Sequence, residues 1–429
     1  MEALYLKFYL NKNYNTAGLL ANIYITLSAT AVMRFVFEDI KFVQEKDCVK
    51  GVFLKIFSFR LGFGELEKIG AFKVKDGALD ISGSGALVSR KFNALLLKGF
   101  SALKNDLSGK KAVYVHKNSG IPLIGSVSFG IIDRNTSIIE VKPITSCNLD
   151  CVFCSVWEAR RCVDFVVEAD YIIDELKKLV EFKGCDDIEV HIGCQGEPLR
   201  YAKLCWLISE IKKLGVKRVS MDTNATMLTK NVVDGLIGAG LTRFNISLNS
   251  LDEGLAEKIA GACYNLKRVL EIIKYIAGRN VELVIAPVWV PKVNDFEIDK
   301  IIGFGVKLGK KQSAPLFGIQ KYLKYKHGRS LKEMGWDEFF SGLREIEKKY
   351  KVKLVLNESD FSIKKTKELP KPFKNGVVVR AEILCPGRMK GEKIACAGGR
   401  MITVESEKSG IVDIRITRSK HNIFYGEVV

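Results

Sequence analysis

Three cysteines, Cys147, Cys151 and Cys154, lie close together in one short stretch of the chain. Cysteine thiolates are ligands for zinc and for iron–sulfur clusters. In a C-x3-C-x2-C spacing, three thiolates can hold three irons of a four-iron cube and leave the fourth iron open to a small molecule. Clusters that only transfer electrons use four cysteines. The spacing therefore indicates a cluster that does chemistry on a bound ligand.

A zinc site is the alternative for so tight a group of cysteines. Zinc motifs combine a C-x2-4-C pair with a second pair, or with histidines, at a set distance. The chain has 11 cysteines but only 4 histidines, and no such second pair follows the motif. The sequence therefore favours iron and sulfur over zinc.

The stretch 146–155, Ser-Cys-Asn-Leu-Asp-Cys-Val-Phe-Cys-Ser, resembles the signature of the radical S-adenosylmethionine (radical SAM) superfamily, including the aromatic Phe153 before the last cysteine. The resemblance covers about residues 138–325. It implies one 4Fe–4S cluster on the three cysteines, with S-adenosylmethionine bound to the open iron. It also implies reductive cleavage of that sulfonium to a 5′-deoxyadenosyl radical, which abstracts a hydrogen atom from a substrate.

A second motif, Gln195-Gly196-Glu197-Pro198, follows the next strand-like run at 188–193. It is similar to the Gly-Gly-Glu turn of the superfamily, with Gln195 in place of the first glycine. Glycine lets the backbone approach a ligand closely, and a glutamate offers a carboxylate to an ammonium group. The resemblance therefore implies that Gly196 and Glu197 bind S-adenosylmethionine.

Polar residues end two further strand-like runs. Asn224 follows the run from residue 218, and Ser247 and Asn249 follow the run from residue 244. The resemblance implies contacts from these three residues to the ribose hydroxyls or the carboxylate of the cofactor. A helix cap or a turn explains each of them equally well, because Asp, Asn and Ser commonly cap the helix after a strand.

Helix-like and strand-like runs alternate through the region of the resemblance. The helical patterns lie at about 168–183, 199–214, 229–239, 252–278 and 295–309. Such alternation predicts an α/β fold with right-handed βαβ units and a parallel sheet. The resemblance implies a partial (β/α)6 TIM-type barrel. Its sixth strand, at 314–320, would place Gln320 and Tyr322 on the substrate side.

Length and composition predict several domains, since the chain has 429 residues and is 47% apolar. We expect an N-terminal extension (1–33), a small β-rich domain (34–136), the barrel (137–330), a basic helical or linker segment (331–375) and a small β-barrel (376–429). In the β-rich domain we expect a helix near 90–106 and a hairpin turn at Lys75-Asp76-Gly77.

The first 33 residues carry no charge between Asn13 and Met33, and Ala29-Thr30-Ala31 mimics a signal-peptide cleavage site. The stretch holds too many polar residues for a membrane span. A translation start at Met33 is an alternative explanation. Free, unevenly spaced cysteines suit a reducing compartment, so we expect a cytoplasmic protein without a membrane partner.

Short strand-like runs separated by glycines fill the C-terminal region. They lie at 377–384, 393–396, 400–404, 411–416 and 424–429. Five strands in so short a segment predict a small barrel. Its length and position resemble the TRAM domain, an OB-like barrel found in several RNA-modifying radical enzymes. A structural cap on the preceding domain is the alternative.

Charge favours RNA as the partner. The chain has a net charge of +18, and residues 300–375 hold 19 basic and 8 acidic residues, which gives +11. Basic groups interleaved with aromatics, as at 321–329, can contact phosphates and stack on bases. A solvated lysine-rich face is the alternative. The candidate RNA contacts are Lys321, Lys324, Lys326, Arg329, Arg388 and Lys390.

The sequence thus predicts a radical SAM enzyme that modifies a structured RNA such as tRNA and takes electrons from a ferredoxin or flavodoxin. The alternative is radical chemistry on a small metabolite or cofactor precursor, with the C-terminal barrel as a lid or assembly element. A non-enzymatic iron–sulfur scaffold would leave Gly196 and Glu197 unexplained. No side chain is assigned to catalysis, and a methyl-carrying role for Cys385 or Cys396 stays open.

Overall fold

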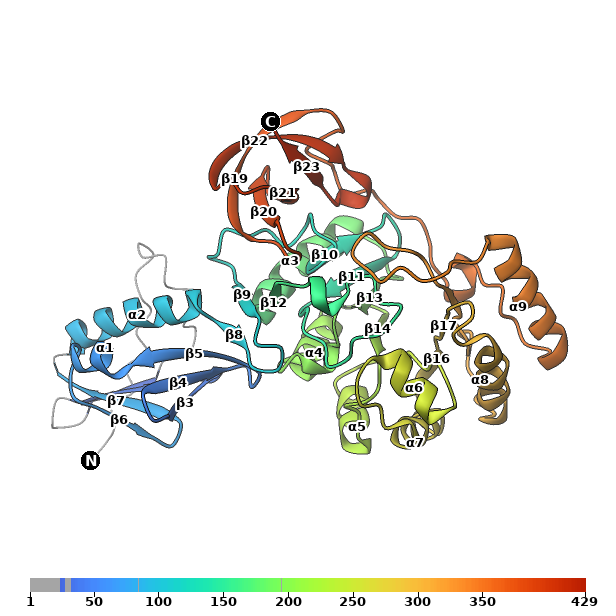
Figure 1. The fold of residues 1–429 in the computed structure, drawn as a ribbon, viewed down its shortest axis with the longest axis horizontal. Coiled ribbons are helices and arrows are strands. Elements are labelled where there is room, and N and C mark those ends of the chain that lie inside the picture. Colours follow the sequence, from blue (N-terminus) through green and yellow to red (C-terminus); the bar gives the residue numbers. More distant parts are fainter. Residues whose placement is uncertain (1–23, 28–31, 84, 194) are drawn as a thin grey trace. The chain divides into compact units, whose positions relative to one another are not determined.

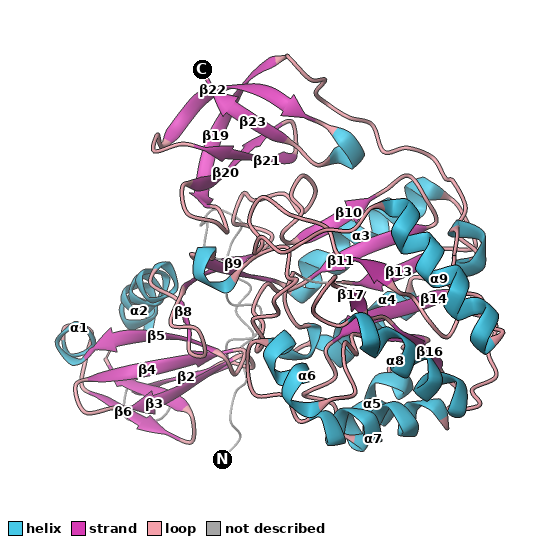
Figure 2. Ribbon diagram, turned by 45° about the vertical axis from the view of Figure 1, so that its right-hand side comes forward, coloured by secondary structure: helices cyan, strands magenta, loops and turns pink. Residues whose placement is uncertain are grey.

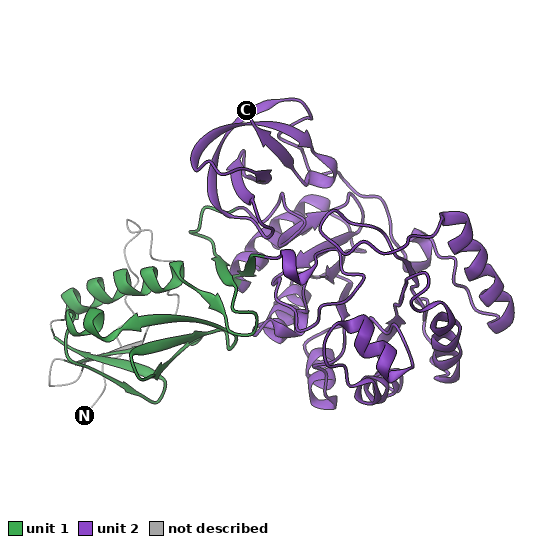
Figure 3. Cartoon of the chain, in the orientation of Figure 1, with its two compact units in different colours: residues 1–121, 162–168 green, residues 122–161, 169–429 purple. Residues whose placement is uncertain are grey.

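The computed structural model describes residues 24–27, 32–83, 85–193 and 195–429. Contacts divide the chain into two compact units, residues 1–121 with 162–168 and residues 122–161 with 169–429 (Figure 3). The first unit thus ends at residue 121 rather than at the expected 136, and it also takes residues 162–168. The predicted extension 1–33 falls largely outside the described residues. In the described part of the chain, no helix has the length and apolar character that crossing a membrane requires.

The first unit contains two β-sheets (Figure 1). One has the order β1-β2-β7-β6, with β1 Tyr24–Leu27, β2 Val32–Val36, β7 Ala78–Ser82 and β6 Phe72–Lys75. The other has the order β12-β9-β8-β5-β4-β3, with β12 Val163–Val167, β9 Lys111–Val115, β8 Lys104–Asn105, β5 Phe57–Gly62, β4 Cys48–Phe53 and β3 Ile40–Gln44. The predicted hairpin is present, because β6 and β7 are joined by Asp76 and Gly77 with φ of 54° and 75°.

Helices α1 (Phe63–Glu67) and α2 (Gly85–Ser101) complete this unit. An apolar stripe on α2 faces the sheets, and its Phe92 ring lies 4.2 Å from Phe35 and 6.1 Å from Phe42. Such aromatic contacts add to the burial of the stripe. The helix begins five residues earlier than the expected 90, since its apolar period already starts at Val88.

The second unit is built on a six-stranded sheet of order β10-β11-β13-β14-β15-β16. Its strands are β10 Gly130–Asp133, β11 Ile138–Lys142, β13 Glu189–Ile192, β14 Arg218–Thr223, β15 Arg243–Ile246 and β16 Glu282–Ile285. β10 pairs antiparallel with β11, and the other neighbours are parallel. The carboxyl ends of five strands therefore meet at one edge, where ligands bind in open α/β sheets.

Helices connect the parallel strands, as Figures 1 and 2 show. They are α3 Ala169–Lys183, α4 Leu204–Lys213, α5 Lys230–Gly238, α6 Glu253–Ala260, α7 Leu266–Ala277 and α8 Asp295–Lys307. The mixed α/β fold is confirmed. The single helix expected at 252–278 is wrong, because Gly261 adopts φ 63° and ends α6, and Asn265 caps α7.

The sheet has one apolar and one polar face. Apolar side chains such as Val190, Met221 and Phe244 are fully buried. Helix α4 packs near β14, and α7 packs near β16. Successive residues in a strand point to opposite faces. The opposite face, which we call the inner face, carries Glu140, Lys142, Glu189, His191, Ser220, Asp222, Arg243 and Asn245.

The expected sixth strand is shorter than predicted. Phe317 forms an isolated bridge with Ile285, and β18 (Gln320–Lys321) pairs with β17 (Val288–Trp289). The partial (β/α)6 barrel stays a prediction. Helix α9 (Trp336–Tyr350) follows in the basic segment, and the short 3-10 helices are Glu158–Arg160, Pro198–Arg200, Glu358–Phe361 and Lys420–Asn422.

The C-terminal region forms a closed five-stranded barrel of order β19-β20-β21-β23-β22. The strands are β19 Val378–Pro386, β20 Glu392–Ala397, β21 Arg400–Glu405, β22 Gly410–Arg418 and β23 Tyr425–Val428. β21 and β23 run parallel, and the remaining pairs are antiparallel. Ala395, Ile402, Ile414 and Phe424 fill its core. The predicted small barrel is confirmed, and the resemblance to TRAM stays a prediction.

Candidate cofactor site

The cysteine loop follows β11 and is held by the end of α6. The amide of Asp150 donates to the carbonyl of Ala260 (2.9 Å), and the amide of Val152 donates to the carbonyl of Ile259 (2.9 Å). The last carbonyls of a helix lack partners within it and are available for such bonds. Gly261 makes the approach possible, because a Cβ there would lie 2.3 Å from the Asp150 oxygen.

Arg329 braces the same loop from another segment. Its Nη1 donates to the carbonyls of Asp150 (2.8 Å) and Cys151 (3.0 Å), and its Nη2 pairs with the Asp150 carboxylate. A Cβ at Gly328 would lie 2.8 Å from the carbonyl oxygen of Cys154. The guanidinium is thus engaged with the cysteine loop, and the predicted contact of Arg329 with RNA stays a prediction.

The thiols of Cys147 and Cys151 sit where a cationic metal is needed to ionise them. Burial, together with the nearby Glu197 and Cys154, raises the pKa of Cys147 to about 11. Burial also raises the pKa of Cys151 well above its usual range, with Cys147 and Cys154 adding to the effect. Thiolates gathered in this way repel one another unless positive charge lies between them. The three cysteines therefore fit an iron–sulfur cluster.

Glu197 is a buried carboxylate beside this loop. Its side chain accepts hydrogen bonds from the Thr223 hydroxyl (2.8 Å), the Asn224 amide (2.9 Å) and the Leu199 amide (3.2 Å). Burial raises the pKa of Glu197 to about 7, although these hydrogen bonds act in the opposite direction. Three of its acceptor positions are used, so the carboxylate retains capacity for one more donor.

Gly196 places that carboxylate against the cysteine loop. The Glu197 amide donates to the Ser146 carbonyl (2.9 Å). A Cβ on Gly196 would lie 2.6 Å from backbone atoms of both Thr145 and Ser146. The glycine is therefore required by the contact between the two segments, which the sequence motif alone did not reveal.

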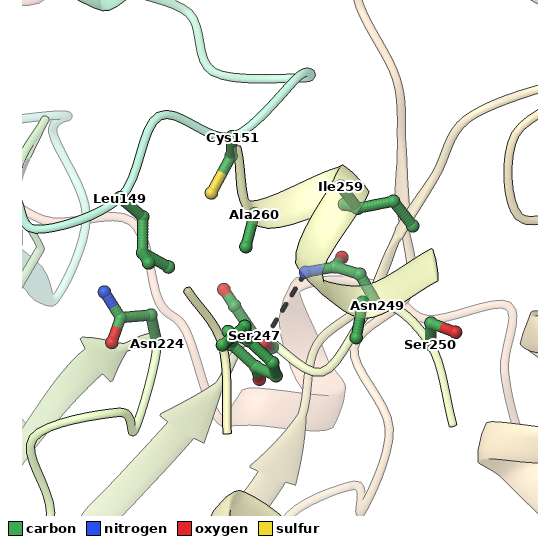
Figure 4. Close-up of a pocket in the computed structure, with 10 residues that line it drawn as sticks. Leu149, Cys151, Asn224, Ser247, Asn249, Ser250, Ile259 and Ala260 are labelled. Carbon is green, nitrogen blue, oxygen red and sulfur yellow. Dashed lines mark hydrogen bonds between the residues drawn. The ribbon is translucent and has the colours of Figure 1, made fainter. Parts of the chain in front are cut away.

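Asn224, Ser247 and Asn249 line one cavity together with Cys151 (Figure 4). None of the three caps a helix, because the N-caps of α5 and α6 are Thr229 and Asp252. Asn224 is tied to the cysteine loop through Asn148 (3.1 Å). Asn249 also accepts a hydrogen bond from the Val288 amide (2.9 Å). The capping explanation is therefore wrong. The alternative of a turn holds for Asn224, whose Oδ1 accepts from the Thr226 amide (3.0 Å). All three residues remain candidates for the cofactor.

Tyr264 is a lining residue that the sequence did not indicate. It is 7% exposed, and its hydroxyl has no hydrogen-bond partner in the described part of the chain. Burial raises the pKa of this hydroxyl, and nearby Cys151 and Glu197 do so too. The residue was hidden because the segment between α6 and α7 was expected to be helical. The break at Gly261 was the signal that could have found it.

The other predicted RNA contacts divide into buried and exposed groups. Lys321 is 8% exposed and pairs with Glu333, so its prediction as a surface contact is wrong. Lys326 is exposed and pairs with Glu405. Lys324 and Lys390 are exposed.

Arg388 is the clearest departure from expectation, since it is only 1% exposed. Its Nη1 donates to the side-chain oxygen of Gln195 (2.8 Å), and its Nη2 donates to the carbonyls of Thr145 (3.0 Å) and Gln195. Its predicted contact with RNA is therefore wrong. On the expected substrate side, Gln320 is exposed, whereas Tyr322 is buried and donates to the Arg329 carbonyl (2.7 Å).

Comparison with known proteins agrees with this geometry. The sequence profile of the Radical SAM superfamily matches residues 141–305. An uncharacterized protein of Methanocaldococcus jannaschii, MJ0103, is 38% identical over 360 residues, which are 76% of this chain and 83% of that protein. The chain belongs to the radical SAM superfamily. It is accordingly an enzyme that binds a 4Fe–4S cluster and S-adenosylmethionine.

More distant similarities are partial. A probable GTP 3′,8-cyclase of Sulfurisphaera tokodaii is 31% identical over 182 residues, which are 42% of this chain and 56% of the cyclase. The chain thus spans about half the length of that cyclase. The chain also aligns with the crystal structure of Streptococcus suis SuiB bound to S-adenosylmethionine. The alignment covers 74% of this chain and 71% of the SuiB chain, with a TM-score of 0.41 and 16% identity.

Proposed function

We propose that Cys147, Cys151 and Cys154 hold the cluster and that Glu197 binds S-adenosylmethionine in the adjoining cavity. The observation that carries this assignment is the cavity itself, where Cys151 faces Asn224, Ser247 and Asn249 from separate segments. The bound cluster supplies the electron that cleaves the sulfonium and leaves a 5′-deoxyadenosyl radical. The protein supplies a carboxylate for the amino group, polar groups for the rest of the cofactor and a buried setting.

We further propose a small polar molecule as the substrate. On the inner face, His191 Nε2 lies 3.1 Å from Asp222 Oδ2, and Asn245 donates to Asp222 Oδ1 at 2.9 Å. The Asp222 side chain is 51% exposed and can contact a ligand. Ser247 of the cavity follows Asn245 by two residues, roughly 7 Å along an extended chain. The polar groups of the inner face thus lie close to the proposed position of the cofactor.

Two observations favour this proposal over RNA. Three of the six predicted RNA contacts, Lys321, Arg329 and Arg388, are engaged within the protein. In addition, the partial cyclase relatives carry the name of an enzyme that acts on GTP, a small nucleotide.

Modification of a structured RNA remains the second candidate. The net charge of +18 and the exposed Lys324 and Lys390 favour it. For either substrate we propose a ferredoxin or flavodoxin as electron donor. A cytoplasmic location suits an oxygen-labile cluster.

Reductive cleavage under anaerobic conditions separates the two substrates. Reconstituted protein, dithionite and S-adenosylmethionine are combined with either a low-molecular-weight cell extract or bulk tRNA, and 5′-deoxyadenosine is measured. We expect the extract to stimulate cleavage in the wild type but not in Asp222→Asn, whose basal cleavage should stay within about twofold. Stimulation by tRNA alone, equal in both proteins, would establish the RNA candidate and remove the inner face from the substrate site.

A further inference from the structure

The loop between β19 and β20 carries a guanidinium into the interior of the second unit. Arg388 is among the largest fully buried side chains in the described residues. Burying a charged group is costly unless hydrogen bonds replace its water. Arg388 donates to one side-chain amide oxygen and to two backbone carbonyls. A guanidinium buried in this way acts inside the protein and not at its surface.

The positions of the partners give that reason. Thr145 lies two residues before Cys147, and Gln195 lies two residues before Glu197. One planar guanidinium therefore joins the segment that holds the cluster to the segment that holds the proposed cofactor carboxylate. Arginine suits this position because its rigid fork can donate to several acceptors at once, which lysine cannot do in the same geometry.

The barrel that carries Arg388 is itself attached to the second unit. The Met401 amide donates to the Ile124 carbonyl (2.8 Å), and the Phe424 amide donates to the Gly125 carbonyl (2.9 Å). Gly125 has a φ of 136°, and a Cβ there would lie 2.2 Å from the Met401 oxygen. The loop of Arg388 is thus carried by a barrel with several backbone attachments.

We infer that the C-terminal barrel is an internal clamp on the cofactor site and that Arg388 is its positioning residue. Arg388 holds the Gln195–Glu197 turn against the cysteine loop, so that the Glu197 carboxylate stands where the amino group of S-adenosylmethionine needs it. This inference rests on the proposed assignment of Glu197 to the cofactor. It also explains Gln195, whose amide oxygen accepts from Arg388, as a glycine at that position could not.

The clamp makes the barrel part of the cofactor site. If the barrel were an RNA-binding appendage, loss of residues 376–429 would leave cleavage of S-adenosylmethionine intact. Because Arg388 belongs to this segment, its loss should instead impair the cofactor site.

The test compares three full-length variants after anaerobic reconstitution. Arg388→Met removes the clamp, Gln195→Ala removes one of its acceptors, and Arg380→Met is the control, since Arg380 is an exposed arginine of the same barrel. We would measure the iron content, the Kd for S-adenosylmethionine and the change in the spectrum of the reduced cluster when S-adenosylmethionine is added. We expect full iron in all three variants. The Kd should rise about tenfold or more in Arg388→Met, which loses hydrogen bonds from a charged group, and about threefold to tenfold in Gln195→Ala, the range of a single typical hydrogen bond. The spectral change should weaken in parallel, and Arg380→Met should match the wild type.

A Kd in Arg388→Met within about twofold of the wild type would overturn the clamp. If that variant does not fold, Gln195→Ala decides, and unchanged affinity there overturns it equally. Glu197→Gln in the same assay distinguishes a failure of the clamp from a failure of the proposed assignment of Glu197 to the cofactor. Normal binding by Glu197→Gln removes the proposed cofactor assignment, whereas weak binding by Glu197→Gln beside normal binding by Arg388→Met removes only the clamp.

Discussion

At the scale of single residues, Glu197 carries the most specific chemistry. Its carboxylate must be ionised to accept a hydrogen bond from the amino group of the cofactor, and burial raises its pKa to about 7. Affinity for S-adenosylmethionine should therefore rise as the pH increases from 6 to 8, by about tenfold from the ionised fraction alone. Glu197→Gln should cost about 1–3 kcal/mol of binding free energy at pH 8 and flatten this pH dependence, with iron content unchanged. Calorimetry that finds the same affinity and the same pH profile in both proteins would remove Glu197 from the site.

Tyr264 offers a second residue-scale prediction. Its buried hydroxyl lines the cavity without a partner in the described residues, and such groups ordinarily have one. We expect Tyr264→Phe to weaken S-adenosylmethionine binding by about 0.5–1.5 kcal/mol, the net value of a typical hydrogen bond. Tyr275→Phe is the control, because that hydroxyl donates to Asp234 at 2.6 Å outside the cavity. Equal affinities in the two variants would show that the Tyr264 hydroxyl does not contact the cofactor.

At the scale of elements, the junction of α6 with the cysteine loop depends on Gly261. Gly261 and Gly215 both have positive φ, 63° and 79°, but only Gly261 has the Asp150 oxygen where a Cβ would stand. Substitution by alanine costs each site roughly 1 kcal/mol in backbone strain. Gly261→Ala should in addition displace the cysteine loop and lower iron incorporation several-fold, whereas Gly215→Ala should incorporate iron normally. Iron analysis and thermal unfolding of the pair would check this, and equal iron content would contradict the role of the junction.

The elements also show what local pattern can and cannot predict. The proximity of the cysteine loop, Glu197 and the polar strand ends was predictable, because each follows a strand directly and parallel strands end at one edge. The places of Arg388 and Lys321 were not, because their burial arises from contacts between segments far apart in the sequence. A basic side chain in a basic stretch looks the same in sequence whether it faces solvent or an internal carbonyl.

At the scale of the whole molecule, the net positive charge favours RNA binding, whereas the burial of several basic side chains weakens the case for it. With Lys321, Arg329 and Arg388 engaged internally, only Lys324, Lys326 and Lys390 of the predicted set are exposed. Three phosphate contacts would give a log–log salt slope for tRNA binding of about −2 to −3. Reversal of these three lysines to glutamate should abolish that slope. A much steeper slope that survives the reversal would show that another surface binds RNA.

The central claim concerns the cluster and its three cysteines. Anaerobic reconstitution should give about four irons per chain, and dithionite with S-adenosylmethionine should then yield 5′-deoxyadenosine. Cys151→Ala should lose both the cluster and the product while the protein stays folded by circular dichroism. Eight irons in the wild type, or wild-type iron and 5′-deoxyadenosine in Cys151→Ala, would contradict a single cluster held by Cys147, Cys151 and Cys154.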